Sequence, residues 1–209
     1  RELASRGCVV MRVDLSGFGD SAPLDHPTGH PVYFPEGQAE LEALCGWMRS
    51  RTGARTCAVL GLCSGAYYGL RAATSPGTIN ELIAVNPLTF YWHDGDEMIL
   101  PDYKVQGEVR RYLQPKGQLA RLRKLLRGKV NVRKSLGLLR RNARSGLTYA
   151  GRDIGRLVGW PLRDDLARDL RSMLDRGVRV RFVVAASDPG VDMLRRQGGA
   201  WVRHCLRRG

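Results

Sequence analysis

Several features that would quickly assign a protein to a class are missing from this sequence. No apolar run approaches the ~18 residues that a membrane-spanning helix needs, and the amino end lacks the apolar core of a signal peptide. The five cysteines are an odd number and include no C-x-x-C pair. That pattern argues against a disulfide framework or a zinc site and favours reduced thiols in the cytoplasm. We therefore expect a cytoplasmic protein with no metal and no cofactor.

Two kinds of binding motif are also absent or incomplete. The glycine-rich stretch L-S-G-F-G-D-S, residues 15–21, lacks the third glycine of the dinucleotide-binding fingerprint and the lysine of a phosphate-binding loop. We interpret it as a structural loop. The basic residues are not interleaved with aromatic ones and match no recognised nucleic-acid-binding motif, so we expect no nucleic acid as a partner.

The sequence does contain an unusual excess of positive charge in one segment. The chain has 209 residues, of which 43% are apolar, and a formal net charge of +14. Between Lys104 and Arg144 there are 14 Lys or Arg residues against one acid, Glu108, so nearly all of the net charge lies there. The length suits one domain, or one domain with an insertion.

Apolar patterning predicts an α/β fold. Strands are expected at residues 8–14, 57–62, 79–86 and 178–186, and helices at residues 35–51 and from residue 191 to the end. Strands that alternate with helices are typical of a mostly parallel sheet. The basic segment interrupts this alternation. We therefore predict a core at residues 1–87 and 176–209, and a helical, basic insertion at residues 88–175.

An apolar strand leads into the stretch with the strongest chemical signal. G-L-C-S-G, residues 61–65, places Cys63 between two glycines at a turn from a strand into a helix. This is the G-x-nucleophile-x-G pattern of a nucleophile elbow, with cysteine in the central position. Gly61 and Gly65 allow a strained turn and close helix packing, and the Ser64 N–H then points toward an oxyanion. The alternatives are an inert cysteine in a glycine-flanked turn, or Ser64 as a nucleophile that breaks the spacing.

The segments around this turn resemble the α/β-hydrolase superfamily. L-A-S-R-G-C-V-V-M-R-V-D-L-S-G-F-G-D-S, residues 3–21, is similar to its fourth-strand segment, and V-N-P, residues 85–87, to its sixth strand. More narrowly, G-L-C-S-G-A followed by V-N-P-L-T-F-Y-W-H-D-G-D resembles hydrolases found with bacterial exopolysaccharide or exosortase systems. The resemblance implies a partial α/β-hydrolase fold in which the insertion is a cap over the active site.

The same resemblance implies a catalytic triad in the chain order nucleophile, acid, histidine. Cys63 takes the nucleophile position. Asp188, which follows the last predicted strand, takes the acid position. The alternative role of Asp188 is to form an Asp-Pro-Gly turn, and Asp192 is a weaker substitute for the acid.

No histidine occupies the third position of the triad. His204 lies in a segment that we predict to be a surface helix, and His26, His30 and His93 precede the acid. The first three strands of the family, with their H-G-x-G-like loop, have no counterpart either. We therefore expect an internal fragment of a longer enzyme, inactive by itself, with its triad histidine beyond Gly209.

These residues predict acyl transfer through a cysteine. The G-x-C-x-G pattern is similar to that of dienelactone hydrolases and polyhydroxyalkanoate synthases. Thiolates attack activated carbonyls well, so we expect an ester or thioester substrate. Hydrolysis and transfer to another acceptor both stay open. The alternative is a non-catalytic, hydrolase-like module that binds a partner through its basic face.

The basic insertion has three interpretations. The first is a solvated cap whose leucines cover the active site. The second is a surface for an anionic membrane, which would place a cytoplasmic protein at the periphery of the inner membrane. The third is a surface for an acidic substrate or partner, such as a polysaccharide. Nucleic acid also fits the charge but ranks last.

Overall fold

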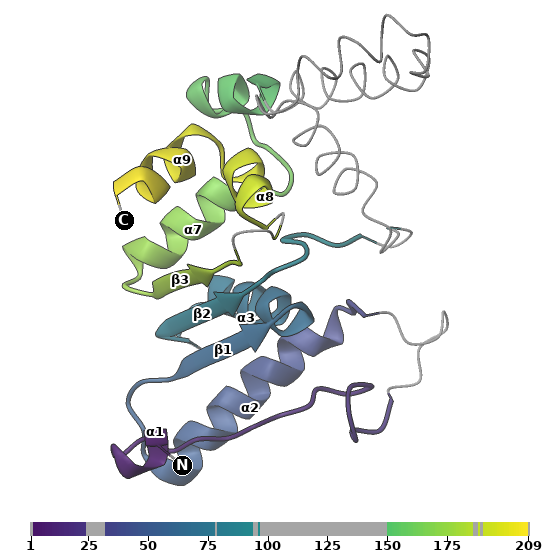
Figure 1. The fold of residues 1–209 in the computed structure, drawn as a ribbon, viewed down its shortest axis with the longest axis vertical. Coiled ribbons are helices and arrows are strands. Elements are labelled where there is room, and N and C mark those ends of the chain that lie inside the picture. Colours follow the sequence, from purple (N-terminus) through teal and green to yellow (C-terminus); the bar gives the residue numbers. More distant parts are fainter. Residues whose placement is uncertain are drawn as a thin grey trace, which may run out of the picture. The chain divides into compact units, whose positions relative to one another are not determined.

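A computed structural model of the chain describes residues 2–23, 32–77, 79–93, 96, 150–185, 188 and 190–208. Contacts divide the chain into two compact units, drawn together in Figure 1. The first, which we call the sheet unit, comprises Arg1–Trp92 and Leu166–Val191. The second, the helical unit, comprises His93–Asp165 and Asp192–Gly209. The basic stretch from Lys104 to Arg144 lies outside the described residues.

The sheet unit contains three parallel strands: β1 (Ala58–Leu62), β2 (Glu81–Val85) and β3 (Arg179–Val183). β2 lies between the other two, as Figure 1 shows. The register pairs Leu82 with Val59 on one side and with Val180 on the other. The prediction of an α/β fold with a parallel sheet is therefore confirmed for this part of the chain.

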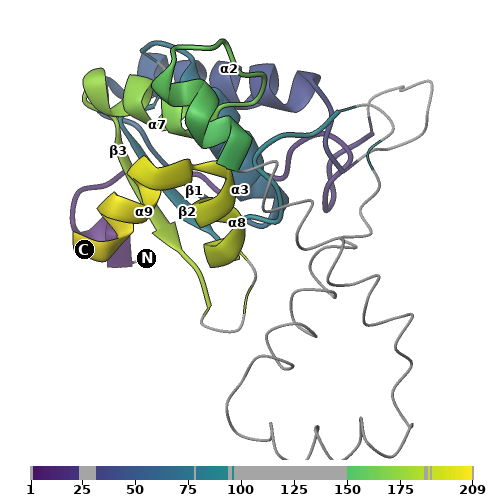
Figure 2. The ribbon, with the colours of Figure 1, turned by 90° about the horizontal axis from the view of Figure 1, so that it is seen from above.

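Helices cover one face of this sheet. The sheet unit contains α1 (Glu2–Ser5), α2 (Glu36–Thr52), α3 (Ser64–Thr74) and α7 (Leu166–Asp175). Helix α3 contacts β1, β2 and α2, while α7 contacts β3 and α3 (Figure 2). Gly69 brings α3 close to the sheet, because a Cβ there would stand 2.7 Å from Leu82 Cδ1. Leu82 and Ala84 are 0% exposed on this covered face.

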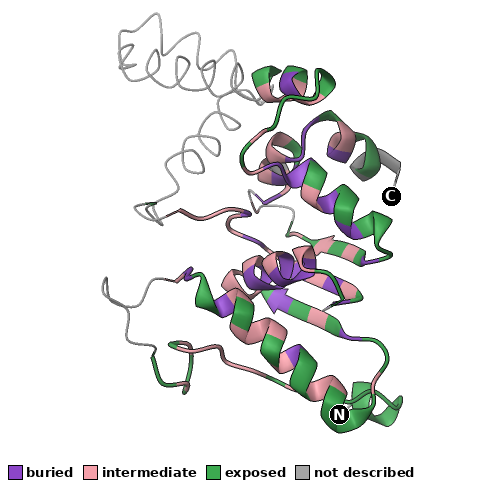
Figure 3. Cartoon of the chain, turned by 180° about the vertical axis from the view of Figure 1, so that it is seen from behind, coloured by how far each residue is buried: buried purple, intermediate pink, exposed green. Residues whose placement is uncertain are grey.

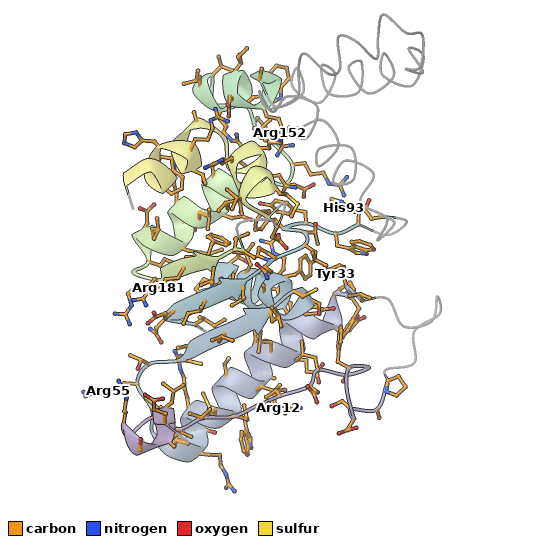
Figure 4. All side chains as sticks on the ribbon, in the orientation of Figure 1. Arg12, Tyr33, Arg55, His93, Arg152 and Arg181 are labelled. Atoms are coloured by element: carbon orange, nitrogen blue, oxygen red, sulfur yellow. The ribbon has the colours of Figure 1, made fainter. Side chains whose placement is uncertain are left out.

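The opposite face of the sheet is exposed. Leu60 and Leu62 on β1 are 69% and 60% exposed, and Val183 on β3 is 52% exposed. Along β1 and β3 exposed residues alternate with intermediate or buried ones, and along β2 buried residues alternate with intermediate ones (Figure 3). Figure 4 shows Arg181 directed away from β3 on this face, where it pairs with Glu81 at 3.5 Å. Parallel sheets are normally covered on both faces. In the described part of this chain, helices cover one face and leave the other exposed.

The strand predicted at residues 8–14 is not part of the sheet. These residues pair with no described strand, and Val9 and Val10 are exposed. The chain is attached to α2 instead, because the N–H and Oγ–H of Ser16 donate to the Glu40 carboxylate at 2.9–3.2 Å. Apolar alternation yields a strand only where a neighbouring edge can accept its hydrogen bonds. The prediction was wrong because residues 8–14 pair with no neighbouring edge among the described strands.

The last segment of the chain forms two helices where one was predicted. α8 (Gly190–Gln197) and α9 (Gly199–Arg208) are separated at Gly198 and Gly199. Gly199 has a φ of 69°, a left-handed conformation that interrupts a helix and favours glycine. The prediction of one continuous helix was therefore wrong. None of the helices that the structure describes is long and apolar enough to cross a membrane.

Ion pairs hold the helical unit together. Arg156 lies 2.8 Å from both Asp153 and Asp165, and Arg203 on α9 lies 2.7 Å from Asp153. Burial raises the pKa of Asp153, but the hydrogen bonds and charges of Arg203 and Arg156 outweigh it and leave that pKa below its ordinary value. The carboxylate therefore stays ionised between its two guanidinium partners.

Leu82→Ala should destabilise the sheet unit by about 2–5 kcal/mol, because it opens a cavity between β2 and α3. Leu60→Ala is the matched control, since the same atoms are removed from a side chain that is 69% exposed, and it should cost under about 0.5 kcal/mol. Urea unfolding of both variants measures the difference. Equal losses would contradict the placement of the core on one face of the sheet.

Candidate active site

Cys63 stands at the turn between β1 and α3. Its backbone N–H donates to the Val85 carbonyl at 3.0 Å, which continues the pairing with β2 beyond β1. Its backbone angles are φ 57° and ψ −112°, a combination that residues with a side chain rarely adopt. Strain of this kind persists only where the surroundings impose it, and it is concentrated at functional sites. The G-x-C-x-G pattern predicts this same strain.

The close approach of α3 to β1 depends on Gly61. A Cβ at Gly61 would overlap the backbone of Gly65 and Ala66 in the first turn of α3. A Cβ at Gly65, by contrast, would meet no described atom within 4 Å. The two glycines of the pattern therefore differ in role. Gly61 leaves the space, and the backbone at Gly65 fills it.

The first turn of α3 presents backbone N–H groups next to Cys63. The first N–H groups of a helix have no carbonyl four residues earlier. Those of Ala66 and Tyr67 donate to the Cys63 carbonyl, at 3.2 and 3.4 Å. Ser64 and Gly65 precede them as the first two residues of α3. Their N–H groups, at the positive end of the helix dipole, can stabilise an anion. Ser64 lies inside the helix, so the strained position belongs to Cys63 and not to Ser64.

Aromatic side chains gather beside Cys63. The ring centroid of Tyr33 lies 4.6 Å from that of Tyr67 and 4.8 Å from that of Trp92, and Figure 4 shows Tyr33 on the side at which the strands end. Tyr33 is 3% exposed, and its hydroxyl has no hydrogen-bond partner among the described residues. Burial, with Cys63 and Tyr67 adding to the effect, raises the pKa of Tyr33 to about 12. The phenol is therefore a neutral donor for which no described residue provides an acceptor.

Sequence analysis missed Tyr33. It lies far before Cys63 in the chain, in a segment to which no functional motif was assigned. The one signal that could have indicated it is the Tyr33-Phe34 pair directly before α2, since aromatic residues are unusual in an exposed loop. Only the folded chain places this tyrosine beside the nucleophile candidate.

Tyr68 shows what a structural tyrosine does in the same aromatic cluster. Its hydroxyl donates to the Val32 carbonyl at 3.0 Å and accepts the Phe34 N–H at 2.9 Å. Its ring is 1% exposed, and burial raises its pKa. Tyr68 thus attaches the backbone on both sides of Tyr33 to helix α3. The two hydrogen bonds of the Tyr68 hydroxyl therefore hold the backbone that carries Tyr33, whose own hydroxyl has no partner among the described residues.

Asp188 follows β3 at the same edge of the sheet at which Cys63 follows β1, because parallel strands end at a common edge. With β2 between them, the two strand ends are about 10 Å apart at ordinary strand spacing. Asp188 Oδ1 accepts the Gly190 N–H at 2.8 Å, at the start of α8. A carboxylate has a second oxygen for another donor. The turn-forming role and the acid role of Asp188 are therefore compatible.

Asn86 connects the ends of β2 and β3 before Asp188. Its N–H donates to the Val183 carbonyl, and its Oδ1 accepts the Ala185 N–H, both at 2.9 Å. These bonds hold the end of β3, as far as Ala185, beside β2. Asp192, the weaker candidate for the acid, lies inside α8, and its side chain is outside the described part of the structure.

The structure describes two of the four histidines, and both belong to the helical unit. His93 Nε2 lies 3.1 Å from Asp164 Oδ2 (Figure 4 labels His93), and His204 is exposed on α9. His26 and His30 lie outside the described residues. The described part of the sheet unit therefore contains candidates for the nucleophile and the acid, but not for the histidine. Among the described residues, no group of three or more His, Cys, Asp or Glu is arranged to hold a metal ion.

Gly61→Ala should destabilise the protein by about 1–3 kcal/mol, because the new methyl group must push α3 away from β1. Gly65→Ala is the control, since its methyl group enters open space in a helix and should stabilise by up to ~1 kcal/mol. Thermal unfolding and the alkylation rate of Cys63 check both variants. Similar behaviour of the two variants would contradict the unequal roles of these glycines.

No family model, no curated protein and no solved structure matches this chain.

Proposed function

We propose that Cys63 is the nucleophile of an acyl-transfer enzyme of the α/β-hydrolase type, acting on an ester or thioester. The observation that carries this proposal is the strained backbone of Cys63, held between the end of β1 and the first turn of α3. A turn of this kind presents a nucleophile and backbone N–H groups to the same carbonyl group. The resemblance to hydrolases of exopolysaccharide or exosortase systems belongs to the same proposal.

In the proposed reaction, the Cys63 thiolate attacks the acyl carbonyl while the Ser64 N–H donates to the developing oxyanion. The alcohol or thiol then leaves with a proton, and water or another acceptor releases the acyl group from the sulfur. A histidine would move these protons, and Asp188 would hold its imidazole in the productive orientation. The separation of about 10 Å between the ends of β1 and β3 leaves room for one imidazole ring.

Tyr33 is the second proposed donor toward the substrate. Its buried hydroxyl has no partner among the described residues, and a buried donor without a partner is costly. A substrate oxygen next to Cys63 would satisfy it. Because its pKa is raised to about 12, the phenol keeps its proton at neutral pH and can donate throughout the reaction.

A p-nitrophenyl ester should acylate Cys63 in the folded protein at least about tenfold faster than it acylates Cys8 or Cys205, because only Cys63 has N–H donors at the site of attack. Cys8 and Cys205 are exposed and serve as internal references. Peptide mapping by mass spectrometry measures the three rates. Cys63→Ala should remove the fast phase, and Cys205→Ala should leave it unchanged.

Unfolding in urea is the control for this experiment, since it should make the three cysteines equally reactive. Acylation of Cys8 and Cys205 ahead of Cys63 in the folded protein would overturn the nucleophile assignment. The non-catalytic binding module would then be the better interpretation. The basic stretch on which that module depends lies outside the described residues.

Tyr33→Phe should slow acylation of Cys63 by about 100-fold, the usual effect of losing one oxyanion donor, and should leave the thermal midpoint unchanged or higher. Tyr68→Phe is the matched control, because it removes a hydroxyl with two partners. It should lower stability by about 1–3 kcal/mol and leave the acylation rate of the folded protein within a few-fold. Loss of stability without slower acylation in Tyr33→Phe would show that its hydroxyl is structural.

A further inference from the structure

The helix at residues 150–157 in the helical unit has its polar and apolar sides reversed. Its charged side chains Asp153 and Arg156 are largely buried and lie 2.8 Å from each other. Its large apolar side chains face the solvent instead, since Ile154 is 60% exposed and Leu157 is 86% exposed (Figure 3). A helix on the surface of a protein normally turns its apolar side toward the core. This helix does the opposite.

A network of ion pairs fixes the orientation of this helix. The Arg156 guanidinium donates to Asp165 Oδ1 at 2.8 Å and to the Gln197 carbonyl, at the end of α8, at 2.7 Å. Arg203 on α9 donates to the second carboxylate oxygen of Asp153 at 2.7 Å. A rotation that buried the apolar side of the helix would break these contacts and leave buried charges unpaired, which is costly. The fold therefore imposes the exposure of the apolar side.

The turn after this helix holds a tryptophan at the surface. The Trp160 N–H donates to the Gly155 carbonyl at 2.8 Å, and the Gly159 N–H donates to the Arg156 carbonyl at 3.4 Å. With Gly159 at a φ of 73°, these bonds form a Schellman motif, which ends a helix with a defined backbone geometry. Trp160 is 70% exposed, and Val158 is 69% exposed. We call residues 154–160 the apolar segment, after its exposed large apolar side chains: Ile154, Leu157, Val158 and Trp160.

The charges near the apolar segment are mostly positive. The acids of residues 150–165 all have basic partners among the described residues of the helical unit, at 2.7–3.1 Å: Asp153, Asp164 and Asp165. Arg163 is exposed, and Arg152, labelled in Figure 4, donates to the carbonyls of residues 163 and 164. The stretch from Lys104 to Arg144, which ends ten residues before Ile154, adds 14 basic residues against one acid. These charges favour a negatively charged partner.

We propose that the apolar segment inserts into the interfacial region of an anionic lipid bilayer, while the basic residues around it and before it in the chain attract the lipid phosphates. Tryptophan and aliphatic side chains beside basic residues are typical of segments that lie in this interface. Apolar insertion and attraction to anionic lipid add to each other in such binding. The proposal goes beyond acyl transfer, since it involves neither Cys63 nor a substrate.

A second copy of the chain is a poorer occupant of this segment. The chain has a formal net charge of +14, so two copies that met here would bring like charges together. A bilayer that contains anionic lipid has an apolar interior beneath a negatively charged surface. It therefore matches both the exposed apolar side chains and the positive charge near them.

The test is sedimentation of the full chain with lipid vesicles, measured without any substrate. On vesicles of equal parts phosphatidylglycerol and phosphatidylcholine, Leu157→Ala/Trp160→Ala should lower the partition coefficient by at least about 30-fold, because both truncated side chains are inserted. Leu60→Ala/Leu62→Ala is the matched control, since it truncates two exposed side chains of β1, and it should change the partition coefficient by less than about threefold. Thermal unfolding checks that both double variants are folded.

Val158→Trp is the complementary variant, because it enlarges the inserted surface. It should raise the partition coefficient by about tenfold. Binding of the unmodified chain should weaken as the salt concentration rises from about 0.1 M to about 1 M, which screens the lipid charges. It should also be at least about tenfold weaker on vesicles of phosphatidylcholine alone.

Unchanged binding of Leu157→Ala/Trp160→Ala would show that charge alone attracts the chain to lipid, and it would overturn the proposal. Equal binding to neutral vesicles would overturn it as well. So would the absence of binding to either kind of vesicle. A change of oligomeric state in the double variant would then assign the segment to contacts between copies of the chain. None of these results bears on acyl transfer, because acylation of Cys63 is measured in the absence of lipid.

Discussion

The contact between the first turn of α3 and the end of β1 is the constraint on which the rest of the sheet unit depends. The absence of a side chain at Gly61 lets the two backbones meet. Because they meet, the chain must turn within one residue, and Cys63 takes up a left-handed conformation with φ 57°. The same geometry brings the helix N-terminus to the sulfur. The strain at Cys63 and the position of the first N–H groups of α3 next to it therefore have one common cause.

Burial on one face of the sheet provides the stability that sustains this strain. Leu82 and Ala84 are fully buried on the face of the sheet that the helices cover, and a strained residue persists only when such packing over-determines its position. The other face, with Leu60 and Leu62 exposed, contributes far less. The turn at Cys63 thus depends on a core made of one sheet face and the helices against it.

Buried polar groups in the sheet unit fall into two kinds. The Tyr68 hydroxyl and Asn80 Oδ1 each have two hydrogen-bond partners, which tie α3, α2 and the strands to the chain around them. Tyr33 and the Nε atom of Arg49 are buried without a hydrogen-bond partner in the described part of the chain. Unpartnered buried groups are costly and uncommon, so these two atoms mark positions at which burial lowers the stability of the fold.

The sequence by itself determined the α/β class, the three strands of the sheet and the turn at Cys63, because each depends on local composition and spacing. It did not predict that residues 8–14 would stay outside the sheet, since pairing needs a neighbouring edge that the segment cannot supply. It also did not indicate that Tyr33 packs against Tyr67 and Trp92. Only the tertiary structure decided these pairings, because the packing of helices against the sheet brings together residues that no periodicity along the chain connects.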